Sequence, residues 1–426
     1  MNESSHYAWI YSEIDDLPLY DLHNHLNPRS LAPSSFDDVI FYHYIVSELA
    51  SAGMPWEDLE KTKGQQRLAK ALDYAKFIRN TSTFWSLKRI AEDIYGVRIK
   101  SEKDLVELAN AIEGQKPDAS RATSVIRDKA RVKRSLLTLN PLEAPPKYDR
   151  SLFAGALRLD ALTYDLTATS LLALEKMTAV DLENGEALEE ALNALFKAFG
   201  DLKALAFNPE PSDVFLQPTA SQVGPHLETL RSRGVLKPES RRIISSYVLN
   251  HFLEEAGERE LPVQMMIGVR RPVSGASQPD YALTDFDPSH LRELEELFSR
   301  YYMVTFDVFI GDPLLNHPMA VVAKNFSNVH LSGYWWYAMY PEYISSFLRT
   351  RIQMLPYNKF SGFFSDAYVA DWVYGKACLA KKELARVLSE AVDLDYVDKE
   401  TAIEVAKAVL YDNARSLYGE RGNKNW

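Results

Sequence analysis

The chain reads PLYDLHNH from Pro18 to His25, and the expected fold is built outward from this stretch. A short apolar run of this kind predicts a buried strand, on which residues two apart point to the same face. His23 and His25 can therefore converge on one ion, and imidazole nitrogen is a common ligand of Zn²⁺. The alternative is a purely structural role, because a bare His-x-His pair is frequent in sequences.

Further apolar runs along the chain predict more strands. With the first, the candidates are Pro18–His25, Ser135–Asn140, Phe153–Leu159, Ala204–Asn208, Pro262–Gly268, Met303–Ile310, Val329–Tyr334 and Ser361–Asp366. Helical patterns separate most of them, such as the one from Leu188 to Phe199 that Gly200 ends. This alternation favours an α/β fold, a (β/α)8 TIM barrel. An open doubly wound sheet is the alternative, but no glycine-rich phosphate loop follows the first strand.

The segment between the first two candidate strands is too long to be one barrel helix. It shows only helical patterns, at Phe41–Ala52, Gln65–Arg79, Phe84–Ile94 and Lys103–Ile112. We therefore expect residues 31–134 to form a large helical insertion subdomain after the first strand. Residues 1–30 and 135–426 would together form the barrel.

Composition narrows the class of protein. The 426 residues are 46% hydrophobic and 25% charged, which is typical of a soluble globular protein, and no apolar run is long enough for a membrane helix. Cys378 is the only cysteine, so the chain has no intramolecular disulfide and no multi-cysteine metal site. The net charge of −11 argues against a nucleic-acid partner, and we expect no membrane partner either. Residues Met1–Ser5 do not resemble a secretory signal, so we expect a cytoplasmic protein.

A third metal ligand is expected from another strand, because active sites of TIM barrels lie at the carboxyl ends of the strands. Asp366 closes the last candidate strand and is such a carboxylate. The alternative role is an N-cap for the following helix. Two histidines on the first strand with an aspartate on the eighth are similar to the ligand pattern of amidohydrolase-superfamily barrels, which implies one divalent metal ion, Zn²⁺ in our prediction.

A closer resemblance extends over most of the chain. The stretch Tyr20–Leu26 followed by Phe36–Asp37, with His43–Tyr44 ahead of Gly53 in the insertion, resembles the opening of uronate (glucuronate) isomerases. Further similar segments are Leu157–Asp160, Gln264–Arg271, Tyr334–Tyr337, which resembles the paired tryptophans of the family, and the closing helix Asn413–Gly419. The matches follow in order from about residue 17 to 419.

The resemblance implies a site and a reaction. His23, His25 and Asp366 would bind the metal, and Asp366 and Tyr44 would transfer protons. Substrate contacts are expected from Arg158 and Arg271, as partners of a sugar-acid carboxylate, and from His43, Trp335 and Tyr368. The implied chemistry is aldose–ketose interconversion, in which a base takes the C2 proton and an acid protonates O1.

The sequence departs from the family at two positions. Met266 on the fifth candidate strand stands where the family has a histidine, and a thioether is a poor ligand for Zn²⁺. Tyr368 stands where the family has an arginine, so a fixed cation is missing from the expected carboxylate pocket. Both departures affect metal binding or specificity more than they affect the fold.

Several alternatives remain open from the sequence. A metal-dependent hydrolase or decarboxylase of the same superfamily would use a metal-activated water, and a barrel without catalysis would only bind sugar acids. Lys203 is a weaker candidate for a carboxylated lysine in a two-metal site, and His330 for a neighbour of the metal. We also expect a homo-oligomer.

Overall fold

The computed structural model describes residues 6–274, 276 and 281–419. The prediction about a secretory signal concerns residues 1–5, which lie outside the described residues. In the part of the chain that the structure describes, each helix is too short or too polar to cross a lipid bilayer.

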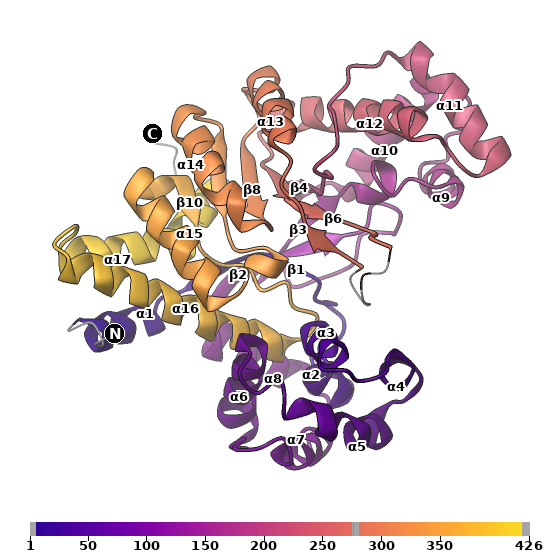
Figure 1. The fold of residues 1–426 in the computed structure, drawn as a ribbon. Helices are drawn as coiled ribbons and strands as arrows, with labels where there is room; N and C mark the ends of the chain where they lie inside the picture. Colours follow the sequence, from indigo (N-terminus) through magenta and orange to yellow (C-terminus); the bar gives the residue numbers. More distant parts are fainter. Residues whose placement is uncertain (1–5, 275, 277–280, 420–426) are drawn as a thin grey trace.

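Eight parallel strands form one sheet in the order β1-β2-β3-β4-β5-β8-β9-β10, with helices packed around it (Figure 1). Each overlaps one of the predicted runs. The strands are β1 (Leu19–Asn24), β2 (Val132–Leu139), β3 (Phe153–Arg158), β4 (Leu202–Phe207), β5 (Val263–Ile267), β8 (Phe306–Ile310), β9 (Val329–Ser332) and β10 (Phe360–Ser361). The α/β TIM-barrel fold that the sequence predicts is confirmed.

The barrel closes where β1 meets the segment that follows β10. The Asp366 N–H donates to the His23 carbonyl at 3.0 Å, and the His25 N–H donates to the Ala367 carbonyl at 3.0 Å. Closure therefore brings the first strand and the residues after the last strand side by side at their carboxyl ends.

The strand predicted at Ser361–Asp366 is shorter than expected, because β10 ends at Ser361. The Gly362 N–H donates to the Val409 carbonyl at 2.8 Å instead of to a neighbouring strand. Asp366 adopts a left-handed backbone conformation with φ 49°, which a regular strand does not contain. The aspartate thus lies on a bent segment beside β1 and not on a strand.

The connections between strands contain helices, except that between β2 and β3, which is a loop over residues 140–152. They contain α9 (Ala168–Thr178), α10 (Gly185–Phe199), α11 (Ala220–Arg233), α12 (Pro238–Glu258), α13 (Pro288–Arg300), α14 (Asn316–Asn325) and α15 (Pro341–Met354). Between β5 and α13 the chain also forms a two-stranded antiparallel hairpin of β6 (Val269–Arg270) and β7 (Leu283–Thr284), which the sequence pattern does not predict.

The chain enters and leaves the barrel through helices. Helix α1 (Tyr7–Asp15) precedes β1, and α16 (Ala370–Asp393) follows β10. The chain then continues through α17 (Lys399–Lys407) and α18 (Asn413–Leu417), joined by a π-helical turn, Ala408–Asp412. That turn supplies the Val409 carbonyl that Gly362 contacts.

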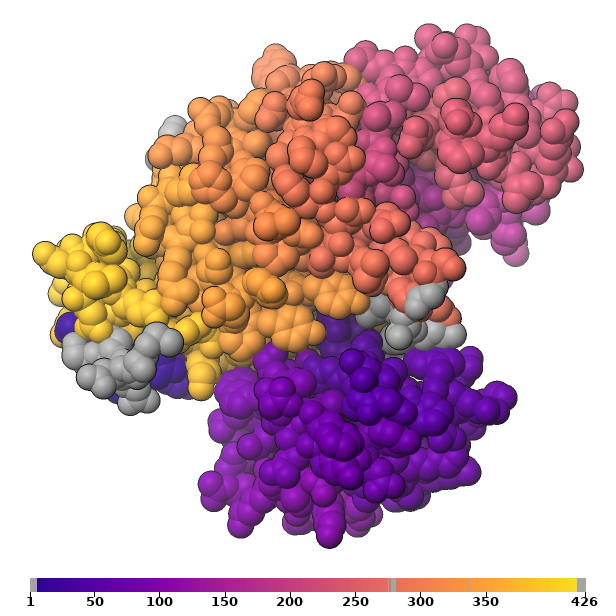
Figure 2. Space-filling model, viewed as in Figure 1, coloured from indigo at the N-terminus to yellow at the C-terminus, as the bar shows by residue number. Residues whose placement is uncertain are grey.

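Between β1 and β2 the structure contains helices only, as the sequence predicts. They are α2 (Asp37–Ile40), α3 (His43–Ser51), α4 (Trp56–Lys61), α5 (Gly64–Ala75), α6 (Ser82–Tyr95), α7 (Asp104–Glu113), α8 (Ala119–Ser124) and a π-helical turn, Val125–Lys129. Most of this segment forms a lobe (indigo to purple) beneath the barrel in the view of Figure 2. That residues 31–134 form a separate subdomain stays a prediction.

The lobe packs against the barrel mainly through α6 and α16. Gly375 allows the close approach, because a Cβ at this position would lie 2.9 Å from Ile90 Cδ1. Hydrogen bonds at 2.7 Å from Tyr95 to Asp371 and from Tyr374 to Asp93 join the same two helices. This contact holds α16 and the lobe in a defined position relative to the carboxyl ends of the strands.

Candidate active site

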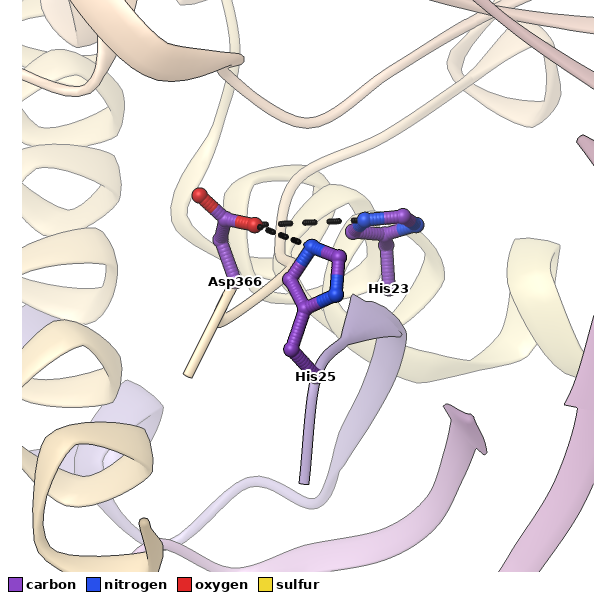
Figure 3. A group of neighbouring side chains, drawn as sticks. All are labelled: His23, His25 and Asp366. Atoms are coloured by element: carbon purple, nitrogen blue, oxygen red, sulfur yellow. Dashed lines mark ion pairs between the residues drawn. The ribbon is translucent and has the colours of Figure 1, made fainter. Parts of the chain in front are cut away.

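Three of the predicted residues converge at the carboxyl end of the barrel. His25 Nε2 lies 3.3 Å and His23 Nε2 lies 3.9 Å from Asp366 Oδ1. One ligand atom from each of the three side chains lies within 4.8 Å of the others. Figure 3 shows both imidazole rings beside the Asp366 carboxylate. We call these three residues the metal cluster.

The backbone positions each member of the metal cluster. His23 lies on β1 and His25 directly beyond it, so the pleat sends both rings to one side. Asp366 reaches them because its backbone pairs with His23 across the closure of the barrel. Two tyrosines from the lobe then hold it: the Tyr42 hydroxyl donates to the Asp366 carbonyl at 2.7 Å and the Tyr44 hydroxyl donates to Oδ2 at 3.0 Å.

The protonation states of His23 and Asp366 suit the binding of a cation. Burial lowers the pKa of the His23 imidazole well below its usual range, and the nearby His25 lowers it further. Burial on its own would raise the pKa of Asp366, but the hydrogen bond to His25 and the charge of Lys376 hold it well below its usual range. A neutral imidazole and an ionised carboxylate are the forms in which these groups bind metal ions.

The spacing of the donor atoms also fits a metal ion. Two ligand atoms bound at about 2.1 Å to a tetrahedral ion lie about 3.4 Å apart. The 3.3 Å between His25 Nε2 and Asp366 Oδ1 is close to this value, and the distance from Asp366 Oδ1 to His23 Nε2 is 3.9 Å. Three protein ligands with nitrogen and oxygen donors would leave a position open, as in catalytic zinc sites.

Arg158 and Arg271, which we call the arginine pair, lie near the metal cluster. The negative charge of Asp366 favours the charged form of both guanidinium groups. Arg158 Nε donates to Asp160 Oδ2, and Asp160 Oδ1 accepts from the Asn208 N–H at 2.8 Å. With its amide oxygen turned toward the pair, Asn208 accepts from Nη2 of Arg158 at 2.5 Å and of Arg271 at 2.9 Å. Burial lowers the pKa of Arg271, and the like charge of Arg158 lowers it further. A bound carboxylate would relieve this repulsion.

Tyr368 forms an aromatic wall at the mouth of the site together with His43. The Tyr368 ring stacks on His25 with centroids 5.0 Å apart, and its edge contacts His43 at 5.3 Å. Tyr368 is 51% exposed, so part of it faces a cleft of about 500 Å³ that Arg67 and Lys63 also line. Burial lowers the pKa of His43 to about 3, so this imidazole is neutral at physiological pH.

Met266 lies on the barrel-facing side of β5. The Gln264 amide donates to the Leu22 carbonyl across the barrel at 2.7 Å, and residues two apart on a strand share a face. Met266 is 2% exposed, so an apolar thioether occupies the position at which the resemblance implies a histidine. Trp335 is also buried and lies beside Gly311 at the end of β8, where a Cβ would be 3.1 Å from the indole ring.

Two weaker candidates do not reach the cluster. Lys203 lies at the start of β4, with Nζ 3.7 Å from Asp201 Oδ1, at the opposite end of the strand from the site. His330 lies near Lys359, which binds the Phe326 and Ser327 carbonyls ahead of β9. Burial, with a smaller effect of Lys359, lowers the pKa of His330 to about 3.

Sequence reasoning missed Lys376, Tyr42 and Asn208. Lys376 carried the clearest signal, because it follows Trp372 and Val373 at helical spacing on an apolar face of α16, where a charged residue is unusual. Tyr42 precedes the His43–Tyr44 pair and carried no signal of its own. Asn208 follows β4 directly and could have been proposed from its place at a strand end.

Two histidines from the first strand and an aspartate after the eighth, at the carboxyl end of a TIM barrel, define a barrel with a three-residue candidate metal centre. No protein-family model matches the chain. The predicted resemblance to uronate isomerases is confirmed, because the chain is 23% identical over 460 residues to a protein of that name from Thermotoga neapolitana, covering 96% of both.

Solved structures show the same fold. The uronate isomerase of Thermotoga maritima has a TM-score of 0.83 at 18% identity and covers 97% of both chains. The glucuronate isomerase of Caulobacter crescentus has a TM-score of 0.84 at 15% identity, covering 99% of this chain and 95% of the other. A Lactobacillus casei protein described provisionally as a metal-dependent hydrolase is less similar, with a TM-score of 0.61 at 15% identity over 96% of this chain and 97% of the other.

Proposed function

We propose that the chain is a metal-dependent isomerase that converts an aldose sugar acid, a uronate or a close relative, into the corresponding ketose. The similarity to uronate isomerases over 96% of the chain supports this reaction. The single observation that carries it is the hydrogen bond of 3.0 Å from the Tyr44 hydroxyl to Asp366 Oδ2. This bond places the Tyr44 phenol, which can exchange a proton, directly beside the Asp366 carboxylate of the metal cluster.

His23, His25 and Asp366 would hold one divalent ion, and we propose Zn²⁺ because the donors are two imidazoles and a carboxylate. Such an ion polarises oxygen atoms of the substrate and stabilises negative charge that develops on them. Met266 adds no effective ligand, so we expect weaker metal binding than with a histidine at this position.

The proton transfers follow from the positions of Asp366 and Tyr44. The Asp366 carboxylate takes the proton from C2, and the Tyr44 phenol gives its proton to O1, which produces an enediol. Tyr44 then takes the proton of the hydroxyl at O2, and Asp366 returns a proton to C1. The product is a ketose with the carbonyl at C2, and both residues regain their starting states.

The arginine pair would bind the carboxylate of the sugar acid. A guanidinium group makes two parallel hydrogen bonds to a carboxylate, and the geometry of Arg158 is already held by Asp160. Tyr368 cannot add a third cation, so we expect the carboxylate to depend on Arg158 and Arg271.

A hydrolase that uses the same metal cluster is the second candidate. It is favoured by the absence of the family arginine at Tyr368 and by the structural similarity to the Lactobacillus casei protein. There Asp366 would accept a proton from water instead of from carbon. The homo-oligomer and the cytoplasmic location stay predictions.

The direct test is turnover. The purified chain, supplied with Zn²⁺, is incubated with D-glucuronate or D-galacturonate, and we expect a ketose to form. The D366N variant serves as the control and should be inactive. Hydrolysis of lactones, esters or amides without any ketose would select the second candidate, and a zinc-bound protein that converts none of these substrates would contradict both.

A further inference from the structure

Lys376 is a buried cation behind the metal cluster that the reaction itself does not use. It lies on α16 and is 5% exposed. Its ammonium group donates to the Tyr42 hydroxyl at 3.1 Å and lies 5.1 Å from the centre of the Tyr42 ring and 4.7 Å from that of Tyr44. Burial lowers the pKa of Lys376 to about 8, so it is still mainly a cation at neutral pH.

The two tyrosines that Lys376 contacts hold the two ends of Asp366. Tyr42 donates to the backbone carbonyl and Tyr44 to the carboxylate. Lys376 has three donor hydrogens and no acceptor, so its bond to Tyr42 leaves that hydroxyl hydrogen directed at Asp366. The cation near the face of the Tyr44 ring adds an attraction that holds this ring in place.

Asp366 needs such support because of its backbone. A residue other than glycine at φ 49° is in the left-handed region, which persists only when the surroundings enforce it. The Asp366 N–H is held by the His23 carbonyl, and its carbonyl is held by Tyr42. Lys376 therefore stands at the outer end of a hydrogen-bond chain that runs through Tyr42 to this strained residue.

We propose that Lys376 is a positioning residue: acting through Tyr42, and by contact with the Tyr44 ring, it holds Asp366 in the orientation that binds the metal ion. The inference rests on the metal site of the proposed function, but not on the identity of the substrate. Partners behind a metal ligand typically contribute about 10- to 100-fold to metal affinity or activity.

The test measures zinc affinity by competition with a chelator for the wild-type chain, K376M, Y42F and the double variant K376M/Y42F. Lys381 provides a matched control, because it lies on the same helix, is 3% exposed and donates to the Asp15 and Leu17 carbonyls, away from the cluster. The thermal midpoint of each variant is recorded in parallel.

We expect K376M and Y42F each to weaken zinc binding about tenfold. The fold-loss of the double variant should be clearly smaller than the product of the two single fold-losses, because both changes interrupt the same route through Tyr42. K381M should bind zinc like the wild type, even where its thermal midpoint falls as far as that of K376M. Y42F removes one hydroxyl group, so it keeps the test informative if K376M does not fold.

Unchanged zinc affinity in K376M or Y42F would overturn the inference, and so would additive losses in the double variant or an equal loss in K381M. Zinc binding does not require turnover, so a chain that binds zinc without isomerising sugar acids would contradict the proposed reaction and leave this inference standing. A wild-type chain that binds no zinc would remove the metal site and the inference together.

Discussion

The metal cluster and the arginine pair are built in different ways. In the cluster, main-chain hydrogen bonds across the closure of the barrel set the positions of His23 and Asp366. In the arginine pair, side chains hold side chains, through Asp160 and Asn208. The first arrangement depends on backbone pairing, and the second depends on side-chain contacts between residues at the ends of β3, β4 and β6.

Because the two parts of the site are built differently, we expect substitutions in one part to leave the other part intact. The chain has all three ligands of the cluster and both arginines that the resemblance implies. It lacks the histidine that the resemblance implies at Met266 beside the cluster, and the arginine that it implies at Tyr368. Metal binding and carboxylate binding should therefore respond separately to mutation. The following predictions test this separation.

The largest effect is expected at Asp366. D366N keeps the size of the side chain but removes the charge that the metal and the C2 proton require, so kcat should fall by about 10³-fold or more, and zinc content should fall with it. D371N is a matched control, because Asp371 is a buried carboxylate on α16 bonded to Tyr95. Equal zinc content in D366N and the wild type would contradict its role as a ligand.

Tyr44 should affect catalysis more than metal binding. Y44F removes the hydroxyl that donates to Asp366 Oδ2, and we expect kcat to fall about 10²-fold while zinc affinity changes by a few-fold at most. Steady-state kinetics on zinc-loaded protein measures this. A loss of zinc with unchanged kcat per bound metal would show that the hydroxyl supports the metal site only.

Arg271 should affect substrate binding without affecting the metal. R271M removes one charged partner of the carboxylate, so KM should rise about 10- to 100-fold with zinc affinity unchanged. R270M is the control, because Arg270 is 50% exposed and pairs with Asp285 at 2.9 Å. Similar KM values in both variants would argue against the arginine pair as the carboxylate site.

Met266 offers a gain of function in the metal cluster. M266H restores the imidazole of the family on the inner face of β5, and we expect zinc to bind about tenfold more tightly. M266L should leave zinc affinity unchanged, since the thioether contributes little as a ligand. Weaker zinc binding in M266H than in M266L would show that this position cannot reach the ion.

The smallest effect is expected at Tyr368. Y368R returns the family cation to a half-exposed position, where an ion pair contributes about 0.2–1 kcal/mol. KM for a uronate should fall by no more than about fivefold, and less at high salt. A rise in KM would indicate that the aromatic wall itself contacts the substrate.

Sequence patterns predicted the features that depend on local periodicity. The eight strands, the helical segment after β1 and the convergence of His23 with His25 all follow from alternation and spacing. Asp366 could be placed at the right end of the barrel, but not on its bent backbone, because the contacts of that segment are with β1 and with Val409, both distant in the sequence. Lys376 on an apolar helix face and Asn208 at a strand end carried a local signal, but their contacts with Tyr42 and with the arginine pair depend on tertiary packing.

The central claim is best tested by proton NMR of the zinc-loaded chain with D-glucuronate and D-galacturonate in D2O. Proton transfer between C2 and C1 through Asp366 predicts a ketose that carries deuterium at C1, and recovered aldose that carries deuterium at C2. If zinc is bound but neither ketose nor deuterium exchange at C2 is observed, the proposed isomerisation of these uronates is wrong.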